Sequence, residues 1–270
     1  NPMKFVFASD SFKGTLSSAE IGAMLCESAR AAFPDCDCRS VTMADGGEGS
    51  VAAVLSPAGG RTVPVRAHDP LGGAVDAFYG VTDGGCAVIE TAAASGLTLI
   101  DEARRDILAA SSYGTGELIA HALDAGYADI TLALGGSATN DGGAGAMAAL
   151  GARFLDADGR TLAPNGASLR RIASIDLSHM HPRLTHARFT AMCDVNSPLT
   201  GPLGATMTYG PQKGASTPAL LGELEAGMEN YARALRRAFP VRVVEFPGAG
   251  AASGLGAACA LFLGAAPQPG

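Results

Sequence analysis

The sequence GGSATNDGGAG, at residues 135–145, decides the fold of this chain. An apolar run at 130–134 leads into it and an alanine-rich run at 144–152 leaves it, which predicts a strand, a tight loop and a helix. Five glycines and no bulky side chain bring the backbone amides close to whatever lies beside the loop. Because amides and the helix dipole converge at a helix N-terminus, we expect an anion site here, with a plain strand-to-helix turn as the alternative. We expect the carboxylate of this stretch, Asp141, to cap the helix and not to act as a catalyst.

Length and composition describe a globular protein. At 270 residues, with 47% hydrophobic and 17% charged residues, the chain is long enough for two domains. The net charge of −7 and the lack of a basic stripe argue against nucleic acid or an anionic membrane as a main partner. The six cysteines are scattered and lack zinc-site spacing, which indicates reduced thiols. No secretory leader or convincing membrane span is visible in the sequence, so we expect a cytoplasmic protein.

Two more polar loops follow predicted strands near the start of the chain. A buried run at 4–8 ends in the loop 9–15, and the next strand, at 39–43, ends in the loop 44–49 before another helix. This order places both loops at the carboxyl ends of strands, where open α/β sheets bind ligands. Their carboxylates can hold a metal or take a proton, and their lysine can meet a phosphate. The candidate residues in these loops are Asp10, Ser11, Lys13, Asp45, Gly46, Gly47 and Glu48.

The sequence pattern changes near residue 67. Runs at 75–81 and 87–89 alternate on either side of a glycine turn, which predicts a hairpin. We therefore expect a first domain at 1–67 and a second domain at 68–270.

The second domain carries two more candidate loops. A strand at 189–193 ends in Asp194, which is either a catalytic base or a turn-capping aspartate. Asn196 follows in the same loop, and Lys213 lies in a glycine-flanked loop that can hold it toward a ligand. A long helix is predicted to begin after its N-cap, Thr217.

Familiar catalytic motifs do not occur in the sequence. Residues 13–15 lack the leading glycine of a Walker A loop, and there is no protein-kinase signature or plausible Gly-x-Ser-x-Gly elbow. The glycines at 248–254 lack Rossmann spacing. The acidic, glycine-rich strand ends and two lysines that remain suit phosphoryl transfer on another scaffold.

Six of these stretches, in this order, resemble the bacterial glycerate kinases of the glycerate kinase type-1 family. They are SDSFKG at 9–14, MADGGEG at 43–49, GGSATNDGG at 135–143, CDVNSPLTG at 193–201, GPQKG at 210–214 and PGAGAASGLG at 247–256. The resemblance implies two α/β domains, a flavodoxin-like or Rossmann-like parallel sheet and an inserted mixed-sheet domain that resembles restriction endonucleases. Sequences of the family continue with a further motif, which implies that residues 1–67 form only the first half of the flavodoxin-like domain. A chain truncated in this way is expected to have poor stability and little or no kinase activity.

The resemblance also implies a reaction. It indicates ATP-dependent phosphorylation of D-glycerate with Mg²⁺, to 2-phosphoglycerate or, as the alternative, to 3-phosphoglycerate. We therefore expect a phosphotransferase with an alcohol acceptor, as a monomer or a homodimer. The other hypothesis is an inactive relative that only binds an acidic or phosphorylated metabolite.

The residues of the motifs supply the expected site. Asp194 or Asp45 accepts or orients the glycerate hydroxyl proton, and Lys13 neutralises phosphate charge during in-line transfer. Asp45 or Asp10 is the expected Mg²⁺ ligand. The expected substrate- or phosphate-binding residues are Asp10, Ser11, Gly46, Gly47, Glu48, Gly135, Gly136, Ser137, Thr139, Asn140, Gly142, Gly143, Asn196 and Lys213.

Overall fold

The computed structural model describes residues 2–12 and 15–268, so Lys13 lies outside the described residues. The strands are β1 (Lys4–Ser9), β2 (Asp37–Thr42), β3 (Gly60–His68), β4 (Ala74–Thr82), β5 (Cys86–Glu90), β6 (Asp129–Ala133), β7 (Arg153–Leu155), β8 (Ser174–Asp176), β9 (Arg188–Met192) and β10 (Ala266–Gln268). The α-helices are α1 (Ser18–Ala32), α2 (Ser50–Ala58), α3 (Thr91–Ser95), α4 (Tyr113–Asp124), α5 (Ala144–Ala149), α6 (Ala205–Tyr209), α7 (Pro218–Ala238) and α8 (Leu255–Phe262). Short 3-10 helices are η1 (Leu97–Leu99), η2 (Glu102–Arg104), η3 (Gly166–Arg171), η4 (Pro182–His186) and η5 (Pro211–Lys213).

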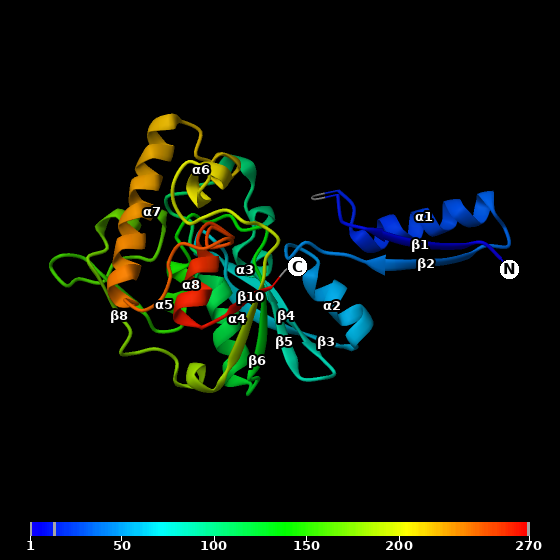
Figure 1. Ribbon diagram of the computed structural model, residues 1–270, viewed down its shortest axis with the longest axis horizontal. Helices are drawn as coiled ribbons and strands as arrows, with labels where there is room; N and C mark the ends of the chain where they lie inside the picture. The colour runs from blue at the N-terminus through cyan, green and yellow to red at the C-terminus, as the bar shows by residue number, and fades with distance from the viewer. Residues whose placement is uncertain (1, 13–14, 269–270) are drawn as a thin grey trace.

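The chain begins with a β1–α1–β2 unit that projects from the rest of the molecule (Figure 1). β1 and β2 form a two-stranded parallel sheet in which Ser9 lies opposite Thr42. α1 starts at a capping box: the Ser17 hydroxyl accepts from the Glu20 N–H, and the Glu20 carboxylate accepts from the Ser17 N–H. Ile21 is buried where α1 packs on the two strands. Because the strands are parallel, the polar loops that follow them leave from the same end of this sheet.

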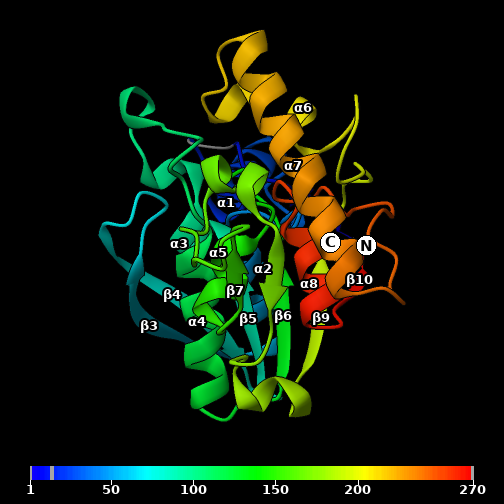
Figure 2. The ribbon, with the colours of Figure 1, turned by 90° about the vertical axis from the view of Figure 1, so that its left-hand side faces the viewer.

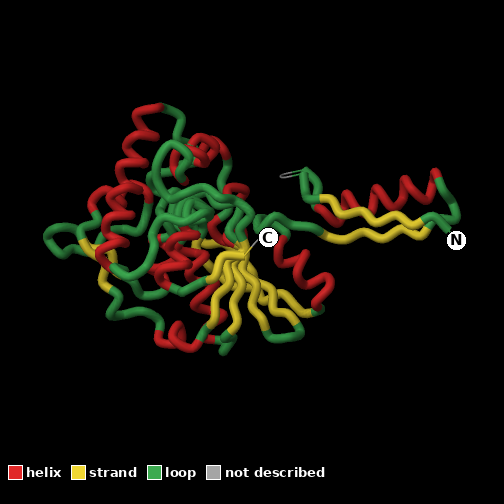
Figure 3. Tube along the Cα trace, in the orientation of Figure 1, coloured by secondary structure: helices red, strands yellow, loops and turns green. Residues whose placement is uncertain are grey.

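The rest of the chain is built on a six-stranded sheet with the order β10-β9-β6-β5-β4-β3 (Figure 3). β5, β6, β9 and β10 are parallel to one another, whereas β3 and β4 are antiparallel to their neighbours. The predicted hairpin is confirmed as the β4–β5 connection, with Val81 opposite Ala87. The mixed α/β class expected from the sequence is therefore confirmed, and the loops after β5, β6 and β9 leave from one edge of the sheet.

The expected domain boundary at residue 67 falls inside strand β3. This strand pairs with β4 along its whole length, from Gly60 opposite Thr82 to His68 opposite Ala74, so residue 67 belongs to the larger sheet. α2 also packs on β4 and β5. The division into two domains stays a prediction, and the pairing of β3 favours a boundary before residue 60 in place of residue 67. The likenesses to flavodoxin and to restriction endonucleases stay predictions as well.

Helices cover the two faces of the six-stranded sheet (Figures 1 and 2). α4 packs on β3 and β5, α8 packs on β9 and β10, and α5 lies between α4 and α8. The long α7 begins after its predicted N-cap, Thr217, and buries Met228 and Tyr231. α2 lies on the opposite face of the sheet. Within the part of the chain that the structure describes, no helix has the length and apolar character to span a membrane.

Candidate active site

Loops from three strands meet at the carboxyl ends of those strands. The 44–49 loop, which follows β2, touches the loop after β6 and the end of β9. A Cβ atom on Gly135 would lie 2.5 Å from the Cα of Gly47, and one on Gly46 would lie 3.2 Å from the Met192 carbonyl oxygen. Since any larger residue would push these backbones apart, glycine at these positions permits the close approach. The structure therefore brings two of the predicted motifs together.

The carboxylates of the first two loops lie at the same end of the small sheet. Asp10 follows β1 and accepts from the Ser11 N–H at 2.7 Å, and Asp45 accepts from the Gly47 N–H at 3.0 Å. Asp10 and Glu48 are exposed, whereas Asp45 is half-buried. The parallel pairing of β1 and β2 places the two aspartates at neighbouring strand ends.

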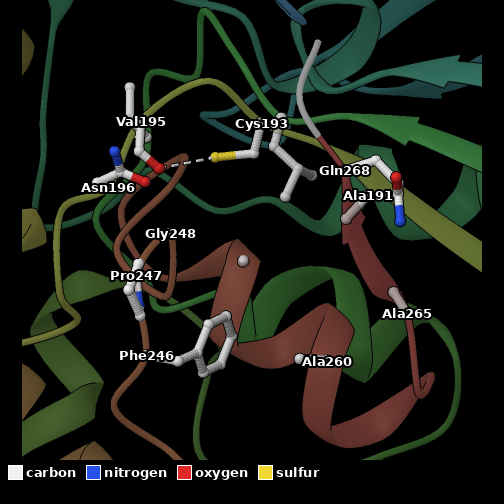
Figure 4. Close-up of a pocket in the computed structure, with 12 residues that line it drawn as sticks. Ala191, Cys193, Val195, Asn196, Phe246, Pro247, Gly248, Ala260, Ala265 and Gln268 are labelled. Carbon is white, nitrogen blue, oxygen red and sulfur yellow. Dashed lines mark hydrogen bonds between the residues drawn. The ribbon is translucent and has the colours of Figure 1, made fainter.

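Asp194 and Asn196 follow β9 and are exposed. Beside their loop lies a cavity of about 170 Å³, whose lining includes Cys193, Val195, Asn196 and Phe246 (Figure 4). The Cys193 thiol donates to the Val195 carbonyl oxygen at 3.3 Å, which holds the turn after the strand. Burial raises the pKa of this thiol, so it is protonated at neutral pH.

The predicted strand, loop and helix around residues 135–145 are confirmed, but the amides at the start of α5 bind the protein's own Asp141. Its carboxylate accepts the N–H groups of Gly143 and Gly145, each at 3.0 Å. It also accepts the N–H of Ser112 at 2.7 Å and the Ser112 hydroxyl at 2.8 Å. The expectation of an external anion at this helix N-terminus is thereby corrected, because a side chain already takes that place. The capping role expected for Asp141 is confirmed.

Asp141 joins two helices inside the protein. It is fully buried, and burial raises the pKa of its carboxyl, an effect that the hydrogen bonds from Ser112, Gly143 and Gly145 partly offset. Ser112 is the N-cap of α4, and its hydroxyl accepts from the Ala146 N–H of α5 at 3.0 Å. One carboxylate and one hydroxyl therefore set the position of α4 relative to α5.

Much of the glycine stretch lies inside the protein. Its buried members include Ser137, Thr139, Asn140, Gly142 and Gly143. A Cβ on Gly142 would lie 2.4 Å from the Tyr231 ring of α7, and one on Gly143 would lie 2.7 Å from Ala258 of α8. Close helix packing thus accounts for these two glycines, and a ligand contact by any of the five buried residues stays a prediction. Gly135 is half-buried and Gly136 is exposed.

Lys213 also lies inside the protein. Its residue is 3% exposed, and its Nζ donates to Ser137 Oγ at 2.8 Å, Thr139 O at 2.9 Å and Ser253 Oγ at 2.7 Å. Burial lowers the pKa of Lys213 to about 7, although the Asp141 carboxylate favours the charged form. The predicted contact of Lys213 with a phosphate stays untested.

Sequence reasoning did not single out Glu90, which supports the 44–49 loop. Glu90 ends β5 and is buried, and its carboxylate accepts the Val51 N–H at 2.5 Å and also the Gly49 N–H. Burial raises the pKa of the Glu90 carboxyl. Because the N-cap of α2 is Gly49, which has no side chain, Glu90 caps that helix from another strand. A carboxylate directly after an apolar strand is the signal that could have found it.

Comparison with known proteins gives relatives over nearly the whole chain. The model of the Glycerate kinase family matches residues 5–270. Glycerate 2-kinase of Escherichia coli (strain K12) is 46% identical over 264 residues, which cover 97% of this chain and 69% of that protein. Glycerate kinase of Bacillus subtilis (strain 168) is 45% identical, over 94% of this chain and 66% of that protein. The crystal structure of a proposed glycerate kinase 2 from Salmonella typhimurium LT2 has a TM-score of 0.86 and 46% identity, and the match covers 100% of this chain and 72% of that one. The chain therefore spans about two thirds of the length of these relatives.

Parallel strands with glycine-rich, acidic loops at their carboxyl ends define an α/β protein of the class that binds small ligands at one edge of its sheet. The chain belongs to the glycerate kinase family. The resemblance of its six motifs is confirmed by this result. The relatives named above are kinases, which are phosphotransferases with an alcohol group as acceptor.

Proposed function

We propose that this chain carries the phosphoryl-transfer site of a glycerate kinase, in which ATP phosphorylates D-glycerate on its 2-hydroxyl by in-line transfer. The observation that supports this most is the backbone contact of the 44–49 loop with Gly135 and with Met192. It gathers the ends of three strands, and with them the acidic loops that carry Asp45 and Asp194, around one place. A carboxylate, a cation and close-approaching glycines are the groups that phosphoryl transfer needs from a protein.

Asp45 and Asp194 are the proposed proton acceptors. They lie on loops that flank the contact, since Asp45 precedes Gly46 and Asp194 follows Met192 by two residues. One of them orients or accepts the hydroxyl proton of the substrate, which strengthens the attacking oxygen as the phosphoryl group departs from the nucleotide. Lys13 is proposed to neutralise phosphate charge.

The donor set fits ATP with Mg²⁺. Among residues 2–12 and 15–268, no three His, Cys, Asp or Glu side chains lie close enough together to hold a metal ion by themselves. Asp10 and Asp45, at neighbouring strand ends, can supply the one or two carboxylates that Mg²⁺ takes when substrate phosphates and water complete its shell. When bound, the ion supplies charge neutralisation between the phosphates. Asp45 or Asp10 is the proposed ligand.

We also propose a cytoplasmic enzyme, a monomer or a homodimer, whose partners are ATP and D-glycerate. All six cysteines carry free thiols, which suits a reducing compartment.

An ADP-release assay with ATP, Mg²⁺ and D-glycerate tests the proposal. It is run on this chain and on a chain extended to the full length of the relatives, and ³¹P spectra of the product separate 2-phosphoglycerate from 3-phosphoglycerate. We expect ADP release that depends on glycerate and a 2-phosphorylated product. ATP turnover that ignores glycerate indicates a hydrolase, and glycerate or ATP binding without turnover in both chains indicates a non-catalytic relative. Either result rejects the proposed function.

A further inference from the structure

We propose that Lys213 is a positioning residue of this site: from inside the protein, its ammonium group holds the glycine stretch 135–145 against Ser253 and does not contact a ligand. This inference rests on the proposed function for the identity of the reaction that the site performs, and for nothing else. Its structural part concerns the protein without ligands and can be tested by itself.

The hydrogen bonds of Lys213 use its full donor capacity. A lysine ammonium group has three N–H donors and no acceptor. In the structure it has three oxygen partners within 2.7–2.9 Å, which are the Ser137 hydroxyl, the Thr139 carbonyl and the Ser253 hydroxyl. The residue is 3% exposed. A ligand could reach this nitrogen only if a partner were displaced and the protein opened.

Ser253 is held in a conformation that needs support. Its φ is +53° and that of Ala252 is +47°, so two consecutive residues other than glycine are in the left-handed region. The Ser253 carbonyl accepts from the Gly142 N–H at 3.1 Å, and its hydroxyl accepts from Lys213. The lysine thus stabilises a strained turn that is also hydrogen-bonded to Gly142 of the glycine stretch.

Lys213 is also linked to the loop that carries Asp194. The Lys213 ammonium group lies 6.0 Å from the centre of the Tyr209 ring, and the Tyr209 hydroxyl is 3.2 Å from Ser197 Oγ. The Ser197 carbonyl accepts from the Gly250 N–H at 2.9 Å. One buried cation therefore lies at the junction of the loops after β6, after β9, after α6 and before α8.

The buried position of Lys213 affects its charge. Burial disfavours the charged form of Lys213, and the Asp141 carboxylate only partly compensates. Hydrogen bonds from an ammonium group are stronger than those from a neutral amine, and the three bonds therefore offset part of the cost of burying the charge.

Hydrogen exchange of the ligand-free protein tests the structural part. In Lys213→Met, whose side chain is also unbranched and is shorter by one atom, we expect amides in 135–145 and 250–254 to exchange at least about tenfold faster than in the wild type. Lys4→Met, at an exposed position of β1, is the matched control. If Lys213→Met fails to fold, Ser253→Ala removes a single partner, and the same two segments are expected to exchange faster. Unchanged exchange in 135–145 and 250–254 in every folded variant overturns the proposal.

Kinetics, together with the exchange data, separate positioning from contact with the reacting groups. We expect Lys213→Met and Ser253→Ala to raise the KM of ATP or D-glycerate by about tenfold and to change kcat by less than about threefold, because a loosened loop weakens ground-state and transition-state binding together. A kcat lowered by about 10²-fold with KM unchanged, in a variant whose ligand-free exchange matches the wild type, shows a lysine that contacts the reacting groups. That result rejects the inference. If the wild type itself shows no turnover, the proposed function fails, and the exchange data still decide the structural claim.

Discussion

At the scale of single residues, the two candidate proton acceptors differ in their surroundings. Asp45 is half-buried and hydrogen-bonded to Gly47, whereas Asp194 is exposed. Asparagine keeps the shape of either side chain but removes its charge and its basicity. We expect the replacement of the true acceptor, Asp45→Asn or Asp194→Asn, to lower kcat by about 10²-fold or more at saturating ATP and D-glycerate. Asp158→Asn, on an exposed turn, serves as the control, and wild-type turnover in both site variants contradicts the mechanism.

Gly135 offers a second test at this scale. Its missing Cβ leaves room for Gly47, whose Cα would be 2.5 Å from that atom. Gly135→Ala is therefore expected to separate the 44–49 loop from the glycine stretch and to lower kcat/KM by about 10²-fold, because misplacement of the reacting groups by about 1 Å has an effect of that size.

The control for Gly135→Ala is Gly222→Ala in α7. A Cβ there meets no atom within 4 Å, and alanine favours a helix over glycine by about 0.5–1 kcal/mol. We expect this variant to be slightly stabilised with unchanged kinetics. Gly135→Ala with wild-type kcat/KM would show that the loop contact is not needed for the reaction.

Glu90 offers a third test at this scale. Glu90→Ala leaves the Val51 and Gly49 amides without their acceptor, so the free energy of unfolding is expected to fall by about 1–3 kcal/mol. Glu90→Gln keeps one acceptor oxygen and is expected to lose less. Urea denaturation measures both, with the exposed Glu27→Ala of α1 as the control. Equal stability of Glu90→Ala and the control would mean that water replaces the cap.

At the scale of elements, Asp141 connects the starts of α4 and α5. Four donors from Ser112, Gly143 and Gly145 point at its two carboxylate oxygens. In Asp141→Asn, the amide NH₂ faces some of these donors, and we expect a loss of about 2–4 kcal/mol in the free energy of unfolding. Thermal or urea unfolding measures it against Asp158→Asn, for which we expect a change below about 0.5 kcal/mol. A loss that small in Asp141→Asn would show that the two helices do not depend on this carboxylate.

The elements that the sequence predicted are those that local chemistry decides. The N-cap at Thr217 and the turn between β4 and β5 each depend on a few neighbouring residues, and each is confirmed. The sheet to which β3 belongs was harder to predict, because its partner is β4 and pairing is not visible in a strand's own sequence.

For the candidate site, the sequence indicated which residues follow the strand ends, but it did not indicate which loops contact one another. A carboxylate after an apolar run marks the end of a strand, and Asp10, Asp45 and Asp194 were found in that way. Which loops touch depends on sheet order and helix packing, so the contact of Gly135 with Gly47 could not be foreseen. The same reason applies to the N–H groups at the start of α5. From the sequence they were expected to be available to an anion, but in the fold the buried carboxylate of Asp141 accepts their hydrogen bonds.

At the scale of the whole molecule, the projecting β1–α1–β2 unit meets the larger sheet through α2 and the loop before it (Figure 1). Among the described residues, the buried charged side chains are Glu90 beside α2, Asp141 between α4 and α5, and Lys213 among the loops. Because each has a pKa moved by burial, the stability of the molecule is linked to pH through these groups.

The effect of Lys213 on the pH dependence of stability has a clear direction. The pKa of Lys213 is 10.5 in an exposed chain and about 7 in the folded protein, so the unfolded state binds more protons between these values. The free energy of unfolding should therefore rise with pH through this window. Above pH 9 the buried Cys259 thiol, with its pKa raised from 9.0 to about 12, acts in the opposite direction. Between pH 7 and 8.5 we expect the wild type to gain about 1–2 kcal/mol relative to Lys213→Met, as measured by urea unfolding at several pH values. A difference that stays constant across this range would mean that Lys213 keeps its ordinary pKa despite its burial.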